Sequence, residues 1–150
     1  MKYARHATAR WLSHPPDGAG HLHSDSRAFE ALPFSIPDGE PESKTTPAEL
    51  LAAAYAAFLS AYLAQALEGD GVPARELVVD VWCRLSPPQI VPRAVEGLEV
   101  EVRGRVEDVD DSEFDEAVHA AWQTCTHALG LRGDLSIEMR IALVPATRAA

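Results

Sequence analysis

The chain contains two cysteines, Cys83 and Cys125, whose thiols have the strongest intrinsic capacity for nucleophilic or redox chemistry in this sequence. They are far apart and do not form the Cys-x-x-Cys pair that is typical of dithiol enzymes and zinc sites. Cys125 belongs to the apolar stripe of a predicted helix, and Cys83 takes an inward position in a predicted strand. Because a buried cysteine commonly behaves as a small hydrophobic side chain, the sequence favours a packing role for both. A reactive Cys125 stays the alternative.

Histidines suggest a metal site, but their spacing does not support one. His21 and His23 share one face of a predicted strand, and His119 and His127 share a predicted helix with Cys125. Metal ligands on one helix are typically four residues apart, as in His-Glu-x-x-His, and these residues lack that spacing. The chain also lacks a Gly-rich phosphate loop and a Gly-x-Ser-x-Gly motif. We therefore expect neither a metal nor a cofactor.

Length and composition indicate one ordinary globular domain over residues 1–150, because 47% of the residues are hydrophobic and 24% are charged. The formal net charge of −10 argues against nucleic acid and anionic membranes as partners, since binding phosphate requires a basic surface. The two cysteines form no disulfide framework, and the first residues contain no apolar stretch of signal-peptide length. We expect a cytoplasmic protein.

The strongest helix signal follows Thr46. Thr46 and Glu49 form a capping-box pattern, and Pro47 suits the first helical position. Residues 50–67 carry no charge and are apolar on every side, so the helix is predicted to be buried all round and to end at the glycines of 68–71. Its length would also allow a membrane span, but the segment is rich in alanine and lacks basic flanks, which favours a buried helix.

The remaining pattern predicts strands over 2–11, 21–32, 77–85, 98–106 and 135–143, with a turn at 14–20, a loop at 33–45 and a second helix from the cap Ser112 to Leu129. Strands with one apolar face and two helices indicate an α+β domain with antiparallel pairing. A long helix that is apolar all round has more surface than one small sheet can cover. The sequence therefore predicts an obligate homodimer.

Three segments occur together in this chain: Ala31–Ser35 (ALPFS), Thr46–Ala57 (TPAELLAAAYAA) and Trp122–Leu129 (WQTCTHAL). Together they resemble the OsmC/Ohr family of thiol-dependent peroxide reductases, and the resemblance covers nearly the whole chain. It implies an OsmC-like fold with antiparallel sheets and two central buried helices in an intertwined homodimer. It also implies a role in the oxidative stress response. In that family a cysteine on the first helix attacks the hydroperoxide, and a cysteine on the second helix resolves the product to a disulfide.

The chain departs from the family pattern where this chemistry occurs. The resemblance places Phe58 at the attacking cysteine and Ala48 at the glutamate that helps to activate it. The activating arginine falls near Pro37, and the resolving cysteine is kept as Cys125. Glu49 remains next to the altered position, but its capping role accounts for it.

These substitutions lead to three functional hypotheses. The first is a non-peroxidatic protein that binds a small apolar ligand at the dimer interface, in a site formed by Ala48, Tyr55, Phe58, Tyr62 and Trp122. The second is a hydroperoxide reductase or other thiol enzyme that acts through Cys125. The third is a structural or partner-binding protein whose pocket is closed by Phe58. Whether the protein is an enzyme therefore stays open at the level of the sequence.

Overall fold

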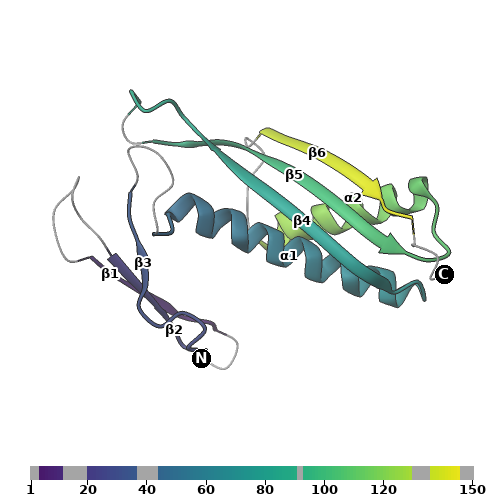
Figure 1. Ribbon diagram of the computed structural model, residues 1–150, viewed down its shortest axis with the longest axis horizontal. Coiled ribbons are helices and arrows are strands. Elements are labelled where there is room, and N and C mark those ends of the chain that lie inside the picture. Colours follow the sequence, from purple (N-terminus) through teal and green to yellow (C-terminus); the bar gives the residue numbers. More distant parts are fainter. Residues whose placement is uncertain (1–3, 12–19, 37–43, 91–92, 130–135, 146–150) are drawn as a thin grey trace. The chain divides into compact units, whose positions relative to one another are not determined.

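The computed structural model describes residues 4–11, 20–36, 44–90, 93–129 and 136–145. The chain divides into two compact units, Met1–Leu50 and Leu51–Ala150, and each contains one of the two sheets. In chain order the elements are β1 (Ala7–Trp11), β2 (Gly20–Ser24), β3 (Leu32–Phe34), α1 (Pro47–Gly69), β4 (Ala74–Leu85), β5 (Val95–Val106), α2 (Asp111–Ala128) and β6 (Ser136–Leu143) (Figure 1). Two helices and two sheets confirm the predicted α+β class.

The first unit contains an antiparallel sheet in the order β1-β2-β3. β1 lies within the strand predicted over 2–11. The strand predicted over 21–32 is wrong beyond β2: a turn follows Ser24, and β3 begins at Leu32 and extends into the loop predicted over 33–45. Arg27 and Ala31 in this turn have φ angles of 59° and 57°, so the chain reverses where an imperfect alternation had suggested an extended strand. The predicted turn at 14–20 and the loop residues 37–43 lie outside the described residues, apart from Gly20.

α1 begins as the sequence predicts. The Thr46 hydroxyl accepts a hydrogen bond from the Glu49 amide at 3.2 Å, and the Thr46 amide donates to the Glu49 carboxylate at 3.1 Å. At the other end Gly71 has a φ of +79°, and the amide of Val72 donates to the Leu67 carbonyl at 2.9 Å. This is a Schellman-type ending, which requires the left-handed conformation that glycine adopts without strain.

The second unit contains the sheet β4-β5-β6. β4 pairs antiparallel with β5, as expected, but β6 pairs parallel with β5, which corrects the prediction of antiparallel pairing throughout. The reason is topological, because α2 connects β5 to β6 and returns the chain to the end of the sheet where β5 began (Figure 1). A short hairpin connection would have forced the opposite direction.

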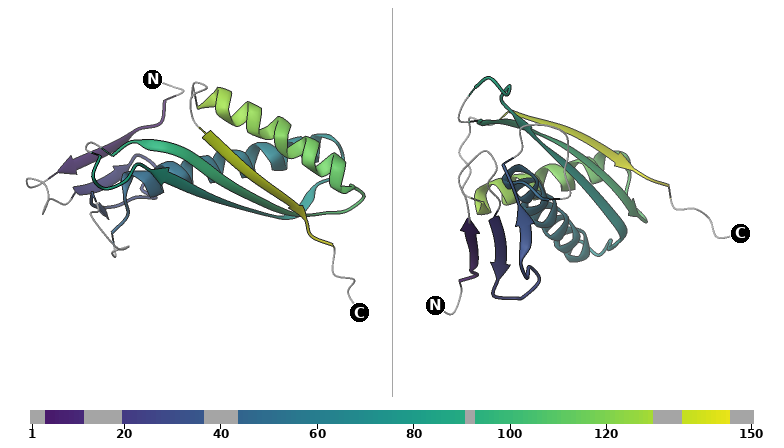
Figure 2. Two further views of the ribbon diagram at one scale, coloured as in Figure 1. Left: turned by 90° about the horizontal axis from the view of Figure 1, so that it is seen from above. Right: turned by 60° about the vertical axis from the view of Figure 1, so that its left-hand side comes forward.

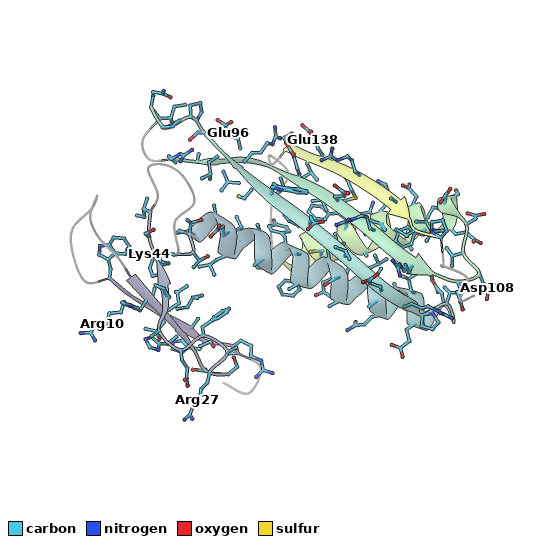
Figure 3. The ribbon with its side chains drawn as sticks, in the orientation of Figure 1. Arg10, Arg27, Lys44, Glu96, Asp108 and Glu138 are labelled. Atoms are coloured by element: carbon cyan, nitrogen blue, oxygen red, sulfur yellow. The ribbon has the colours of Figure 1, made fainter. Side chains whose placement is uncertain are left out.

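The start of α2 also differs from the prediction. Asp110, and not Ser112, is the N-cap: its carboxylate accepts from the Glu113 amide at 2.9 Å, and the Glu113 carboxylate accepts from the Asp110 amide at 3.0 Å. An aspartate followed three residues later by a glutamate forms a complete capping box, which outweighs the isolated serine. Asp108, labelled in Figure 3, lies in the turn that leads from β5 to this cap and has a φ of 58°.

Both helices cover the same face of the sheet β4-β5-β6 (Figure 2). The buried apolar core is formed by Tyr55, Leu59, Leu63 and Leu67 of α1, by Leu98, Val100, Val102 and Val106 of β5, and by Phe114, Val118, Ala121, Trp122 and Cys125 of α2. The prediction that α1 is buried all round is not met within one chain. Only one stripe of α1 is buried, because the sheet and α2 contact the helix from one side.

Much of the remaining surface of α1 is apolar, and part of it is exposed, as at Ala53, Ala57, Phe58 and Ala61. By its length and apolar composition α1 could cross a membrane, a property shared by the core helices of soluble proteins. The buried stripe from Tyr55 to Leu67 packs against the protein's own sheet and α2, so this face of the helix is already occupied.

Candidate functional site

α1 places three aromatic side chains, Tyr55, Phe58 and Tyr62, on successive turns. Residues three and four positions apart are neighbours on a helix surface, so Phe58 adjoins both tyrosines. Tyr55 points into the core and is 1% exposed, whereas Phe58 is 40% exposed. The ring of Phe58 stacks on the ring of Tyr62 with centroids 5.8 Å apart. The position that the resemblance gives to the attacking thiol thus holds an accessible aromatic ring.

α2 extends this aromatic group into the core. The Trp122 ring stacks on Tyr55 with centroids 5.7 Å apart and an interplanar angle of 22°. Four of the five residues predicted to line a ligand site therefore form two stacked pairs, Tyr55 with Trp122 and Phe58 with Tyr62. The two pairs are adjacent because Tyr55 and Phe58 are neighbours on α1. The fifth, Ala48, is half-buried in the first turn of the same helix.

Cys125 is fully buried on the inner face of α2, as its place in the apolar stripe predicts. Burial raises the pKa of its thiol, because a thiolate loses its hydration in apolar surroundings. At neutral pH the side chain is a neutral thiol, which is the weaker nucleophile of the two forms. Its surroundings are those of a packing residue.

Cys83 on β4 packs against the same core and is partly buried, also in agreement with the sequence. Burial raises the pKa of this thiol as well. Both cysteines are free thiols in the structure. Among the described residues no positive charge lowers the pKa of either thiol, and burial is the cause of both shifts.

The hydroxyl of Tyr55 is a feature that the sequence did not predict. Its oxygen is buried and has no hydrogen-bond partner among the described residues. Burial raises the pKa of this phenol, and the nearby thiols of Cys125 and then Cys83 raise it further. The helical period places Tyr55 on the same stripe as Leu59 and Leu63. The burial of its hydroxyl could have been predicted from that alignment.

Glu49 is held by the start of α1. Its carboxylate accepts from the Thr46 amide and also from the Thr45 hydroxyl, at 3.1 Å and 3.0 Å. These hydrogen bonds account for Glu49 as a capping residue, as the sequence predicts. Pro37, where the resemblance places the family's arginine, lies outside the described residues.

The histidines do not converge on a metal site. His23 on β2 is exposed, and its Nδ1 accepts from the Ala31 amide at 3.4 Å. His119 on α2 bonds through Nδ1 to the Asp115 carbonyl at 2.9 Å. Over the described ranges, no group of three histidine, cysteine, aspartate or glutamate side chains is placed to hold a metal ion.

Two open surface hollows lie elsewhere. One, of about 520 Å³, is in the first unit around His6 and Asp25, whose side chains are 3.1 Å apart. The other, of about 560 Å³, lies between the start of α2 and the end of β6. The aromatic residues on α1 line neither hollow.

Comparison with known proteins gives the family. The model of the family described as OsmC-like protein matches residues 39–140, about two thirds of the chain. The chain belongs to the OsmC/Ohr family. No curated protein matches the sequence of this OsmC-like protein.

Solved structures share the fold of this OsmC-like protein over nearly its full length. The OsmC-like protein of Mycoplasma pneumoniae has a TM-score of 0.75 and 16% identity, covering 96% of this chain and 99% of that one. The organic hydroperoxide resistance protein OhrB of Bacillus subtilis has a TM-score of 0.72 and 20% identity, covering 95% and 100%. A putative organic hydroperoxide resistance protein of Vibrio cholerae, with captopril bound in one of its active sites, has a TM-score of 0.65 and 20% identity, covering 94% and 92%.

Proposed function

We propose that this OsmC-like protein does not reduce hydroperoxides and instead binds a small apolar molecule beside Phe58. The observation that carries the proposal is the accessible benzyl ring at the position that the resemblance gives to the attacking cysteine. A hydrocarbon ring cannot attack a peroxide oxygen or take up the resulting hydroxyl group. What it offers is apolar surface.

The surroundings of Cys125 support the first half of the proposal. Peroxide reduction by a thiol begins with attack by the thiolate. Cys125 is fully buried, and burial raises its pKa, so both access and ionisation are unfavourable at neutral pH. These two observations argue against the alternative of a thiol enzyme acting through Cys125.

The aromatic residues support the second half. Ligand sites are mostly apolar with a few polar groups, and the two stacked pairs around Phe58 and Tyr55 have this character. The V. cholerae protein of the same fold holds a small organic molecule, captopril, in an active site. An aromatic ring in place of a thiol would favour more apolar molecules.

We further propose that the protein is an obligate homodimer in the cytoplasm and that the second copy completes the ligand site. The accessible side of α1 is lined by small residues, among them Ala53, Ala57, Ala61 and Ala64, which allow close approach of another chain. Obligate interfaces resemble a core cut in half and often bury more than roughly 2,000 Å². The cytoplasmic assignment rests on the two free thiols.

The test of the assembly is light scattering at micromolar concentration. The expected mass is about twice the 16.2 kDa of one chain. A stable, folded monomer would contradict the dimer and the completed site.

The test of binding uses N-phenyl-1-naphthylamine, a neutral apolar molecule whose fluorescence rises in apolar surroundings. We expect saturable binding to the native protein and a clear loss of affinity in Phe58→Ser. Phe29→Ser is the matched control, because Phe29 is 42% exposed, slightly more than Phe58 at 40%, but lies in the turn between β2 and β3. Absence of saturable binding, or equal loss in both variants, would leave the third hypothesis, a closed structural site.

A further inference from the structure

Tyr55 has a buried polar atom that finds no hydrogen-bond partner in the part of the chain that the structure describes. The side chain is 1% exposed, and its hydroxyl makes no hydrogen bond among the described residues. A buried polar group without a partner loses its hydration and gains nothing in return, so most such groups in native proteins are paired. Phenylalanine would fill the same space without this cost. Since no described residue bonds to this hydroxyl, its hydrogen bond is available to a bound molecule.

The position of Tyr55 connects this hydroxyl to the proposed ligand site. Its ring stacks on Trp122 on one side, and on α1 it adjoins Phe58, which is accessible. Because Tyr55 is 1% exposed, a molecule beside Phe58 reaches it when the side chains around the aromatic rings move apart to admit it. The site then has an apolar body and one polar group at its inner end.

The chemistry around the hydroxyl defines the direction of the missing hydrogen bond. Burial and the two nearby thiols raise the pKa of the phenol, so the hydroxyl stays protonated at neutral pH and can donate. Its ionisable neighbours, Cys125 and Cys83, are acids and not cations. A carboxylate would be buried beside them without a compensating positive charge, which is costly. A neutral acceptor does not carry that penalty.

We infer that Tyr55 is the polar anchor of the site and that the ligand is a flat apolar molecule with one neutral hydrogen-bond acceptor, such as a ketone or ester carbonyl. The inference rests on the proposed function, because it names the ligand class of that same site. The hydroxyl donates to the carbonyl oxygen, and the hydrocarbon part lies against Trp122 and Phe58.

The experiment compares two molecules of similar shape, 2-acetylnaphthalene and 2-isopropylnaphthalene, by displacement of N-phenyl-1-naphthylamine from the native dimer. The measured quantity is the ratio of ketone affinity to hydrocarbon affinity. In Tyr55→Phe we expect this ratio to fall about three- to tenfold, which is the size of one neutral hydrogen bond, while the hydrocarbon affinity stays the same. Ser60→Ala is the matched control, because it removes from the same helix a hydroxyl that already donates to the Ala57 carbonyl at 3.0 Å, and the ratio should not change.

A second readout is the melting temperature of the unliganded protein. Tyr55→Phe should leave it unchanged or raise it, because the variant removes an unpaired buried group. An unchanged affinity ratio in Tyr55→Phe, or a marked fall in its melting temperature, would overturn the anchor role of Tyr55. The proposed function would still stand in that case, provided that the native protein binds the hydrocarbon. If neither molecule nor the fluorescent probe binds the native dimer, the proposed function fails together with the inference.

Discussion

Phe58 and Cys125 stand on different helices at the two positions where the resemblance puts the family's thiol pair, and their surroundings are opposite. Phe58 on α1 is 40% exposed and stacks on Tyr62, whereas Cys125 on α2 is fully buried in the core. The family's cysteine is kept at the buried position, 125, and is replaced at the accessible position, 58. A cysteine that matches a family motif therefore indicates reactivity only when its thiol is also accessible to substrate and has a pKa that allows ionisation.

The largest expected effect on the free energy of unfolding is the difference between the buried and the accessible face of α1. Leu59 is fully buried and Phe58 is accessible, although the two residues are adjacent in the chain. Leu59→Ala should lower the free energy of unfolding by about 2–5 kcal/mol, the usual range for a large-to-small change in a core. Phe58→Ala should cost about 1 kcal/mol or less if its ring lines an open site. Urea unfolding of both variants measures the difference, and a loss of about 3–5 kcal/mol in Phe58→Ala would mean that the ring fills a closed core.

The next effect concerns Cys125 as a packing residue. Cys125→Ser replaces a buried thiol by a more strongly polar hydroxyl and should lower the free energy of unfolding by about 1–3 kcal/mol. Cys125→Ala, which adds no polar group, should cost less. If instead both variants unfold like the native protein, Cys125 contributes little to packing and the structural interpretation of this residue loses its support.

A pH-dependent effect follows from the same burial. The pKa values of Cys125, Cys83 and Tyr55 are raised in the folded chain, so the folded state retains protons that the unfolded state releases. Stability from the thiols is fully present below their unfolded pKa near 9.0 and is lost as the pH rises through the folded value. The slope is at most about 1.4 kcal/mol per pH unit for each group. Unfolding at pH 8 and pH 10 should show this loss for the native protein and a smaller one for Cys125→Ala; equal slopes would contradict the assignment.

A smaller effect compares the starts of the two helices. Thr46 caps α1 and Asp110 caps α2 through equivalent hydrogen bonds. Thr46→Ala and Asp110→Ala should each lower the free energy of unfolding by about 1 kcal/mol, within the usual range of cap substitutions. Ser112→Ala is the control, because Ser112 is not the cap, and its effect should lie within about 0.5 kcal/mol. A large loss of stability in Ser112→Ala would contradict Asp110 as the cap and support the prediction from the sequence that Ser112 caps α2.

The features that could be predicted from the sequence depend on neighbours in the chain. The capping box of Thr46 and Glu49 and the glycine end at Gly71 involve residues within a few positions of one another. The alternation along β4 and β5 likewise reflects one buried face of each strand. The inward position of Cys125 followed from the helical period in the same way.

The features that could not be predicted depend on contacts between distant segments. The parallel pairing of β6 with β5 depends on the path of α2, which strand periodicity does not report. The turn between β2 and β3 depends on two left-handed residues that are not glycines. The burial of the Tyr55 hydroxyl, which has no partner among the described residues, depends on α1, α2 and β4 packing around it.

The central claim is that a member of this family with Phe58 in place of the thiol does not reduce peroxides. The most direct measurement is the consumption of tert-butyl hydroperoxide by the native protein with a dithiol reductant at neutral pH. We predict a rate equal to that of the reductant alone, and at most weak activity in Phe58→Cys. Its new thiol would lack the carboxylate that Ala48 replaces and would keep the pKa of an ordinary, unactivated thiol. Robust turnover by the native protein that Cys125→Ser abolishes would contradict the account and make Cys125 the catalytic thiol.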